Sequence, residues 1–191
     1  MARKQPELTA RTRQNLMDAY WELYTSDTVD KITVKMITDR AGYNRGTFYA
    51  HFLDIEDLHN RIEDALLPSE ESFKKLREAT FSKNSQEIIE IFMQENKSSG
   101  EKVNFLLSSE GSLSFQNKLK GKLRELIMRY ASLDVDEPEK ILDYKANIVC
   151  SIFYETLSYW YDKGNELFSD EEMINLMLKI IYRGVGDMVK D

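Results

Sequence analysis

The stretch ITVKMITDRAGYNRGTFYAHFLDIEDL, residues 32–58, constrains the folds open to this chain more than any other segment. Its first apolar residues recur at helical spacing, which predicts a short helix over residues 34–41. Thr33 precedes this helix in the N-cap position, where its hydroxyl can accept a bond from a first-turn amide. Gly42 follows the last apolar residue and can take the positive φ that ends a helix sharply. A tight turn is therefore expected directly after this helix.

A second helix is predicted after the turn. Asn44 can cap it, and we expect it to run to about Phe52, with Phe48 and Phe52 on one face. The other faces carry polar side chains: Arg45, Thr47, Tyr49 and His51. Two short helices joined by a tight turn form the helix-turn-helix geometry that places the second helix in the major groove of DNA. The competing interpretation is an ordinary surface helix in an all-helical protein, because spacing alone does not distinguish the two.

The second helix has side chains suited to reading DNA. Arg45 can bond bidentately to guanine, and Thr47 can offer its methyl or hydroxyl group to a base edge. Gly46 lacks a side chain, so the backbone can approach the groove closely. Tyr49 and His51 are candidate phosphate ligands, and free amides in the first turn of the preceding helix can hold another phosphate.

These residues resemble the DNA-binding domain of the TetR (tetracycline-repressor) family of bacterial transcriptional regulators. The matching residues are Ile32, Thr33, Val34, Ala41, Gly42, Arg45 to Tyr49, His51, Phe52 and Glu56 to Leu58. The resemblance implies a phosphate contact by Thr33. It also implies roles for residues of the second helix: base contacts by Arg45, Gly46 and Thr47, and backbone contacts by Tyr49 and His51. Ile55 departs from the pattern, because many members have a lysine there that opens the fourth helix against a phosphate.

Further polar side chains complete the predicted interface. Lys35 joins the DNA-binding set, and the candidate contacts to the DNA backbone are Arg3, Lys4, Arg11, Arg13 and Tyr43. Arg3 and Lys4 lie in a basic N-terminal arm, and the next two arginines lie in an amphipathic helix expected over residues 9–24. A frayed tail and a solvated helix face are the alternatives for these two segments. Together the three helices predict a DNA-binding domain over residues 1–53.

The charge is distributed unevenly along the chain. The formal net charge is −7, yet residues 1–52 carry eight basic and six acidic side chains, a net of +2. The remaining 18 basic and 27 acidic side chains give residues 53–191 a net charge of −9. Counterion release on phosphate neutralisation is a local effect, so the acidic remainder does not exclude DNA binding.

The composition favours an all-α protein, because the 191 residues include only three prolines and eight glycines. About nine helices are expected. After a fourth helix that Pro68 ends or bends, helices are predicted over residues 70–81, 86–96, 101–107, from 115 onward, 138–163 and 170–189, with a polar break at 98–100. The basic residues of the helix from 115, namely Lys118, Lys120, Lys122 and Arg124, are expected on a solvated helix rather than in a second nucleic-acid patch.

Residues 54–191 are expected to form an effector-binding and dimerisation domain. The last two helices have more apolar surface than one subunit can cover, which predicts a homodimer through them. The resemblance also implies this dimer, and the segment LLSSEGSLSFQNKL is similar to a segment in TetR regulators of low-GC Gram-positive bacteria. Aromatic residues that could line a cavity for an unknown small-molecule effector are Phe92, Phe105, Tyr130, Phe153, Tyr154 and Trp160, although each fits an ordinary core equally well.

Several classes of function find no support in the sequence. Cys150 is a lone cysteine in an apolar setting, which predicts a buried thiol in a reducing compartment. His51 and His59 lie too far apart for a site within one helical turn, so we predict no metal ion, and His59 is expected on the surface. No cofactor motif, catalytic motif or long apolar run is present, which favours a cytoplasmic protein that is not an enzyme and does not bind membranes.

The sequence thus predicts a ligand-responsive transcriptional regulator, most simply a repressor, that binds a palindromic double-stranded DNA operator as a homodimer. The alternatives are a helical ligand carrier and a protein-interaction adaptor that uses the helix pair without binding DNA. Only the regulator should bind DNA with an affinity that decreases steeply as the salt concentration rises.

Overall fold

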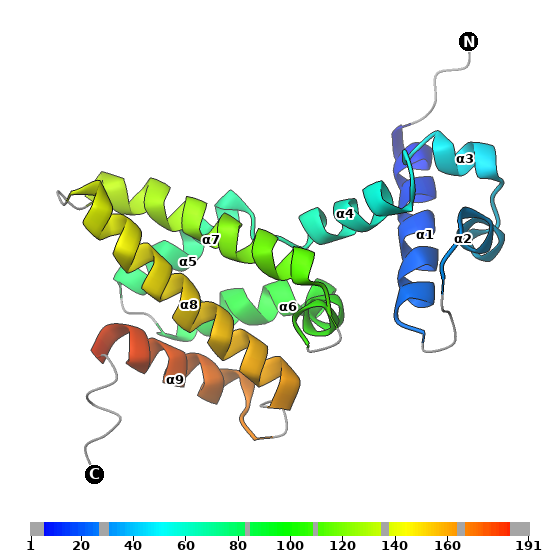
Figure 1. Ribbon diagram of the computed structural model, residues 1–191. Coiled ribbons are helices and arrows are strands. Elements are labelled where there is room, and N and C mark those ends of the chain that lie inside the picture. Colours follow the sequence, from blue (N-terminus) through cyan, green and yellow to red (C-terminus); the bar gives the residue numbers. More distant parts are fainter. Residues whose placement is uncertain are drawn as a thin grey trace. The chain divides into compact units, whose positions relative to one another are not determined.

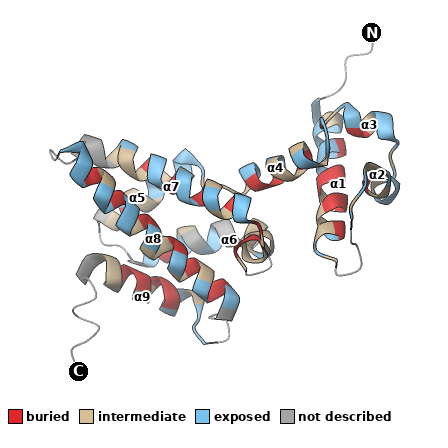
Figure 2. Cartoon of the chain, in the orientation of Figure 1, coloured by how far each residue is buried: buried red, intermediate tan, exposed pale blue. Residues whose placement is uncertain are grey.

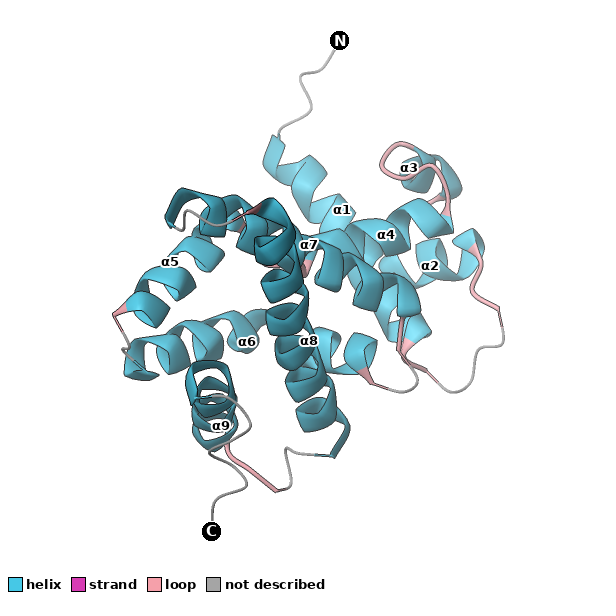
Figure 3. Ribbon diagram, turned by 60° about the vertical axis from the view of Figure 1, so that its left-hand side comes forward, coloured by secondary structure: helices cyan, strands magenta, loops and turns pink. Residues whose placement is uncertain are grey.

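The computed structural model describes residues 6–26, 31–82, 85–108, 111–134, 138–163 and 167–183. Within these residues the chain forms nine helices and no strand. Figures 1 and 3 show how the chain is built from helices and loops. The helices are α1 (Pro6–Tyr24), α2 (Val34–Ala41), α3 (Arg45–Tyr49), α4 (Ile55–Ala65), α5 (Glu70–Phe81), α6 (Ser85–Leu107), α7 (Leu113–Asp134), α8 (Glu139–Lys163) and α9 (Asp170–Arg183). The predicted all-α class and the approximate number of helices are confirmed.

The chain divides into two compact units, Met1–Ala65 and Leu66–Asp191. The first unit therefore contains α4, which the predicted domain boundary at residue 53 assigns to the second domain. The physical reason is that α4 packs its apolar face on α1, through buried Leu58 and Ile62. A segment that shares a core with the preceding helices behaves as part of their unit.

The core of the first unit is built from one apolar face of each helix. Figure 2 shows buried residues along α1 and on α4. The buried apolar side chains are Leu16, Met17, Ala19, Tyr20 and Leu23 of α1, Ile37 of α2, Phe48 and Phe52 of the α3 segment, and Leu58 and Ile62 of α4. α1 begins at Pro6, three residues before its predicted start, because proline is well tolerated in the first turn of a helix.

The second unit packs α5 to α9 around a separate core. α7 lies against α8, and α6 contacts α5, α7, α8 and α9. The predicted break at residues 98–100 is wrong, because α6 runs without interruption from Ser85 to Leu107. Packing against four neighbouring helices stabilises this helix more than serine and glycine weaken it. The C-terminal end of the predicted 170–189 helix lies outside the described residues beyond residue 183.

Some basic side chains of α7 make contacts within the second unit. The Lys120 ammonium lies 3.6 Å from the centroid of the Tyr154 ring, and Arg124 pairs with Asp143 of α8. Lys122 pairs with Glu125 at 3.1 Å. These residues therefore help to attach α7 to α8, in addition to being partly solvated as expected. Cys150 of α8 is buried, as the sequence predicts, and burial raises the pKa of its thiol.

No helix in the described part of the chain combines the length and the apolar character needed to cross a membrane.

Candidate nucleic-acid interface

Both ends of α2 have the caps that the sequence predicts. The Thr33 hydroxyl accepts a hydrogen bond from the Met36 amide at 3.3 Å. Gly42 lies in the left-handed region at φ 74° and ψ 31°. The Tyr43 amide donates to the Thr38 carbonyl at 2.9 Å, and the Gly42 amide donates to the Asp39 carbonyl at 3.4 Å. These two bonds close the end of the helix and turn the chain toward α3.

Asn44 begins α3 as its N-cap. Its side-chain oxygen accepts bonds from the Thr47 amide at 2.9 Å and from the Thr47 hydroxyl at 3.3 Å. A Cβ atom on Gly46 would lie 3.1 Å from the same Asn44 oxygen. The missing side chain at residue 46 therefore leaves room for the cap, in addition to leaving the backbone open to a ligand.

Regular helix in α3 ends at Tyr49, three residues before its predicted end, with Ala50 as its C-cap. The chain continues as a hydrogen-bonded turn, in which the Phe52 amide donates to the Phe48 carbonyl at 2.9 Å. The next amide, that of Leu53, donates instead to the Asp57 carboxylate at 3.0 Å. The start of α4 thus draws the chain away from the axis of α3.

One side of the α3 segment is anchored and the other is accessible. Phe48 and Phe52 are buried, with ring centroids 5.6 Å apart. Tyr49 is 59 % exposed, and Arg45 and Gly46 are also exposed. Two further predicted contacts, Thr47 and His51, are half-buried. The structure therefore presents Arg45, Gly46 and Tyr49 on the solvent side of a helix that the two phenylalanines hold in place.

α1 braces the helix pair with two polar contacts. The Arg40 guanidinium of α2 lies 2.7 Å from the Glu22 carboxylate of α1. The Asn15 amide donates to the Tyr43 hydroxyl at 3.0 Å, so the turn between α2 and α3 is also tied to α1. The Tyr43 hydroxyl keeps its own hydrogen for donation, which leaves it compatible with the predicted contact to a phosphate.

The cations of the predicted interface differ in their availability. Lys35 pairs with Asp39 at 2.5 Å on the exposed face of α2. Arg11, Arg13 and Arg45 are exposed, and the described residues include no ion-pair partner for them. Free guanidinium groups can pair with phosphate or guanine without first breaking an internal salt bridge. Arg3 and Lys4, the predicted basic arm, lie outside the described residues.

The start of α4 is acidic and strongly capped. The Asp57 amide donates to the Asp54 carboxylate at 2.7 Å, and Arg61 donates to the Asp57 carboxylate at 2.9 Å. The bond from the Leu53 amide, followed by the bond from Arg61, lowers the pKa of Asp57. Ile55 is half-buried in this first turn and has no charge to offer a phosphate.

His59 is not the surface residue that the sequence predicts. Its side chain is 18 % exposed and bonds on both sides, to the Tyr20 hydroxyl and to the Glu63 carboxylate, each at 2.9 Å. Glu63 is fully buried. The sequence does contain a signal for this contact. Residue 63 lies four residues after His59, so the two side chains share one face of α4, and residue 63 also follows Ile62 on the side of α4 that meets α1.

The six aromatic residues predicted to line an effector cavity have different surroundings. Tyr130 bonds to Glu70 at 3.1 Å and packs against Phe73 of α5, whereas the Trp160 indole donates to the Phe168 carbonyl at 3.3 Å. Tyr154 is buried beneath Lys120. Two others, Phe105 and Phe153, are half-buried, and the side chain of Phe92 lies outside the described residues.

Comparison with known proteins assigns the first unit. Residues 16–62 match the family model described as bacterial regulatory proteins, tetR family. The first unit is a tetR-family DNA-binding domain. The match covers α1 to α4, apart from the start of α1 and the end of α4, so it includes every capped turn described above. The resemblance to this family that the sequence predicts is confirmed for these residues.

Two similar proteins extend this finding. The tetR-family domain is 36 % identical over 62 residues to the HTH-type transcriptional regulator AcrR of Shigella flexneri. That alignment covers 32 % of this chain and 29 % of the relative, so the similarity spans less than a third of either protein. A solved structure from Streptococcus agalactiae 2603V, described as a TetR transcriptional regulator, shares the fold with a TM-score of 0.62. It is 23 % identical, and the match covers 92 % of this chain and 96 % of that chain.

Proposed function

We propose that this chain is a ligand-responsive transcriptional repressor that binds a palindromic DNA operator as a homodimer. The observation that carries the proposal is the arrangement of α3 in the tetR-family domain. Arg45 is exposed at its first position and has no ion-pair partner among the described residues, while Phe48 and Phe52 hold the opposite face in the core. This is the arrangement in which a recognition helix can enter the major groove.

We assign the DNA contacts as follows. Arg45, Gly46 and Thr47 face the bases, while Tyr49 and His51 contact the backbone together with the start of α2 at Thr33 and Lys35. Lys35 must exchange its pairing with Asp39 for a phosphate, so we expect a smaller contribution from it than from Arg45. Arg11, Arg13 and Tyr43 are further backbone contacts in this proposal.

A second copy of the chain would complete the proposed DNA-binding assembly. α8 exposes large apolar side chains on one face, namely Ile141, Tyr144, Ile148 and Tyr159, and Leu176 of α9 is exposed as well. Burying these side chains between two copies would stabilise a symmetric dimer. Two recognition helices about 34–36 Å apart would then reach successive major grooves of a palindromic site.

Repression would follow when the bound dimer blocks access to a promoter. An effector held among the aromatic residues of the second unit would relieve repression by favouring a state that does not bind DNA. The size of this response is limited by the difference between the effector's affinities for the two states. We propose no enzymatic reaction for the chain.

The test begins with a duplex selected by the full-length chain from a random DNA library. Gel-shift titration should show that Arg45→Ala weakens binding to this duplex by about 1–3 kcal/mol and relaxes the preference at one base pair. Lys74→Ala, which removes a positive charge from exposed Lys74 of α5, is the control and should bind like the wild type. Unchanged binding by Arg45→Ala would refute the assigned role of α3. An adaptor would yield no selected duplex and no salt-dependent affinity.

A further inference from the structure

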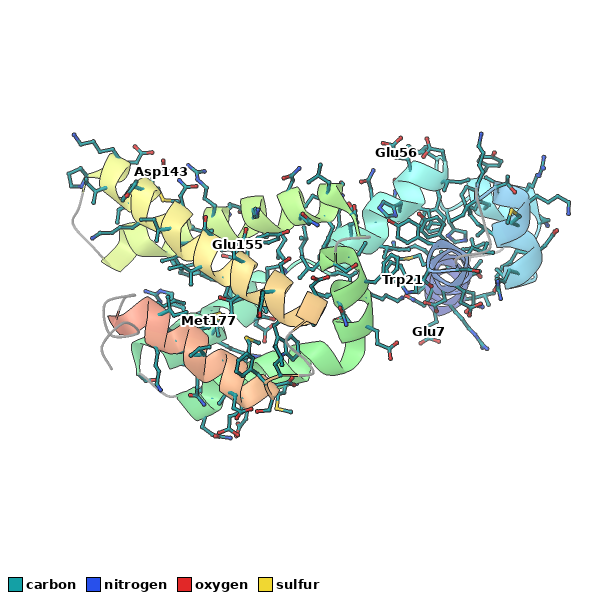
Figure 4. The ribbon with its side chains drawn as sticks, turned by 60° about the horizontal axis from the view of Figure 1, so that its bottom comes forward. Glu7, Trp21, Glu56, Asp143, Glu155 and Met177 are labelled. Atoms are coloured by element: carbon teal, nitrogen blue, oxygen red, sulfur yellow. The ribbon has the colours of Figure 1, made fainter. Side chains whose placement is uncertain are left out.

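Three polar side chains meet between α1 and α4 inside the first unit. Tyr20 is 4 % exposed and its hydroxyl lies 2.9 Å from His59 Nδ1, while His59 Nε2 lies 2.9 Å from Glu63 Oε1. The ring of Tyr24 packs edge-on against His59, with centroids 5.1 Å apart. Figure 4 labels Trp21 and Glu56, which mark the two helices that contribute these side chains.

The hydrogen bonds of this network have a defined direction. Burial, followed by the nearby Tyr24 and Glu63, raises the pKa of Tyr20, so its hydroxyl keeps its proton. A carboxylate can only accept, so Glu63 selects the tautomer of a neutral His59 that has its hydrogen on Nε2 and a lone pair on Nδ1 for the Tyr20 hydrogen. His59 Nδ1 then accepts, and Nε2–H donates to the Glu63 carboxylate. The Tyr20–His59 bond joins α1 to α4, whereas His59 and Glu63 both belong to α4, so the first bond is the one that requires α4 to lie in its present position on α1. Hydrogen bonds are directional, so the network specifies one position more narrowly than apolar contacts do.

The same network also lowers the free energy needed to separate α4 from α1. A buried carboxylate loses its hydration on folding and recovers it when it meets water. If α4 moves away from α1, Glu63 and His59 become hydrated, which offsets part of the burial lost by Leu58 and Ile62. An apolar side chain in place of Glu63 would offer no such compensation. Polar groups at this position therefore stabilise two positions of α4. In the closed position α4 packs on α1, and in the open position these groups contact water.

The remaining helices of the unit have contacts that do not involve α4. Glu22 and Arg40 join α1 to α2, and Asn15 joins α1 to Tyr43 in the turn before α3. The apolar side chains of Leu16, Ile37 and Phe48 are fully buried in the same three helices. α1 to α3 can therefore keep their arrangement when the Tyr20–His59 bond breaks.

We propose that Tyr20, His59 and Glu63 form a polar latch through which α4 opens from α1 as a separate element, while α1 to α3 stay folded. α4 is the last helix of the first unit, and the second unit starts at Leu66. Under the proposed function, on which this one consequence rests, opening of the latch changes the support that α4 gives to the recognition helix within the first unit. The opening itself is a property of the fold and can be measured without DNA.

Hydrogen–deuterium exchange of the full-length chain, followed by mass spectrometry of its peptides, tests the latch. Tyr20→Phe keeps the ring and removes the hydroxyl that donates to His59. We expect amides of α4 to exchange about tenfold faster, the effect of one lost hydrogen bond, with α1 to α3 unchanged. Tyr43→Phe, which removes a hydroxyl bonded to Asn15, is the control and should leave exchange in α4 unchanged. Equal acceleration in all four helices, or none in α4, would overturn the proposal.

A second variant separates a latch from a simple core contact. Glu63→Met keeps a side chain of similar length but removes the charge that hydration would stabilise in the open state. We expect slower exchange in α4 than in the wild type, and equal or faster exchange contradicts the latch. If the latch behaves as expected but no DNA duplex is selected by the chain, the proposed function fails and the latch stands.

Discussion

Gly111 and Gly121 differ in what surrounds them, although both lie at or near α7. A Cβ atom on Gly111 would lie 2.3 Å from the Leu106 carbonyl oxygen, because the chain folds back tightly on the end of α6. The Ser112 amide donates to the same carbonyl at 3.1 Å. Nothing lies within 4 Å of a Cβ on Gly121, an exposed residue inside α7. The helices predicted over residues 101–107 and from 115 onward leave Gly111 between them, but they do not predict this close approach.

Alanine substitution should therefore have opposite effects at these two glycines. Gly111→Ala forces the backbone apart and should lower the free energy of unfolding of the second unit by about 1–3 kcal/mol. Gly121→Ala removes flexibility from a helix interior and should raise that free energy by about 0.5–1 kcal/mol. Urea titration followed by the fluorescence of Trp160, which lies in the second unit, measures both. Similar effects of the two variants would contradict the close contact at Gly111.

Caps and neighbouring helices maintain α3, because five residues are too few for a helix to be stable alone. Its order depends on the Asn44 cap at one end and on the two buried phenylalanines. Local signals predicted its start correctly. They placed its end too far along the chain, because the end depends on the capping of α4 by Asp54 and Asp57.

Loss of the Asn44 cap should weaken α3 and, with it, the proposed DNA binding. Asn44→Ala removes the acceptor for the Thr47 amide and should cost about 0.5–2 kcal/mol of stability in the first unit. Asn44→Ser keeps an acceptor and should restore most of the loss. Thermal unfolding followed by Trp21 fluorescence measures the stability, and gel shift with the selected duplex measures the binding. An alanine variant as stable as the serine variant would show that the cap contributes little.

A polar contact also fastens α5 to α7. Glu70 accepts bonds from Arg129 at 3.0 Å and from the Tyr130 hydroxyl at 3.1 Å. Arg129, followed by Tyr130, lowers the pKa of Glu70 below its ordinary value of 4.5. A carboxyl group with a lowered pKa stabilises the folded state above the unfolded pKa, and this contribution is lost as the pH falls through the folded pKa.

The stability of the second unit should therefore decrease below about pH 4.5 partly through Glu70. Glu70→Gln cannot titrate, so the melting temperature of this variant should depend less on pH between about 3 and 5 than that of the wild type. Because the pair is exposed, high salt should reduce the difference between the two proteins. Thermal melts across this pH range, followed by Trp160 fluorescence, provide the measurement. Parallel pH profiles would show that Glu70 contributes nothing.

For the whole molecule, the proposed dimer makes the clearest prediction. Tyr144 of α8 is 67 % exposed, so substituting it should not disturb the core of one subunit. Tyr144→Asp places a charge in the proposed interface and should shift the protein to monomers in sedimentation equilibrium, with weaker binding to the selected duplex. Asn117→Asp, which adds the same charge to an exposed position of α7, is the control. If both variants sediment like the wild type, this face of α8 does not form a dimer.

The sequence by itself determined the features that depend on neighbouring residues. Thr33, Gly42 and Asn44 act through groups a few residues away, so their caps and turns can be predicted from the sequence. The same holds for the motif that marks the family. Only the tertiary structure decided the features that depend on distant segments. Packing keeps α6 continuous, brings α4 into the first unit and buries Glu63 beside His59, which bonds to Tyr20. These outcomes balance desolvation against contacts between helices, and helical periodicity contains no information about which helices meet.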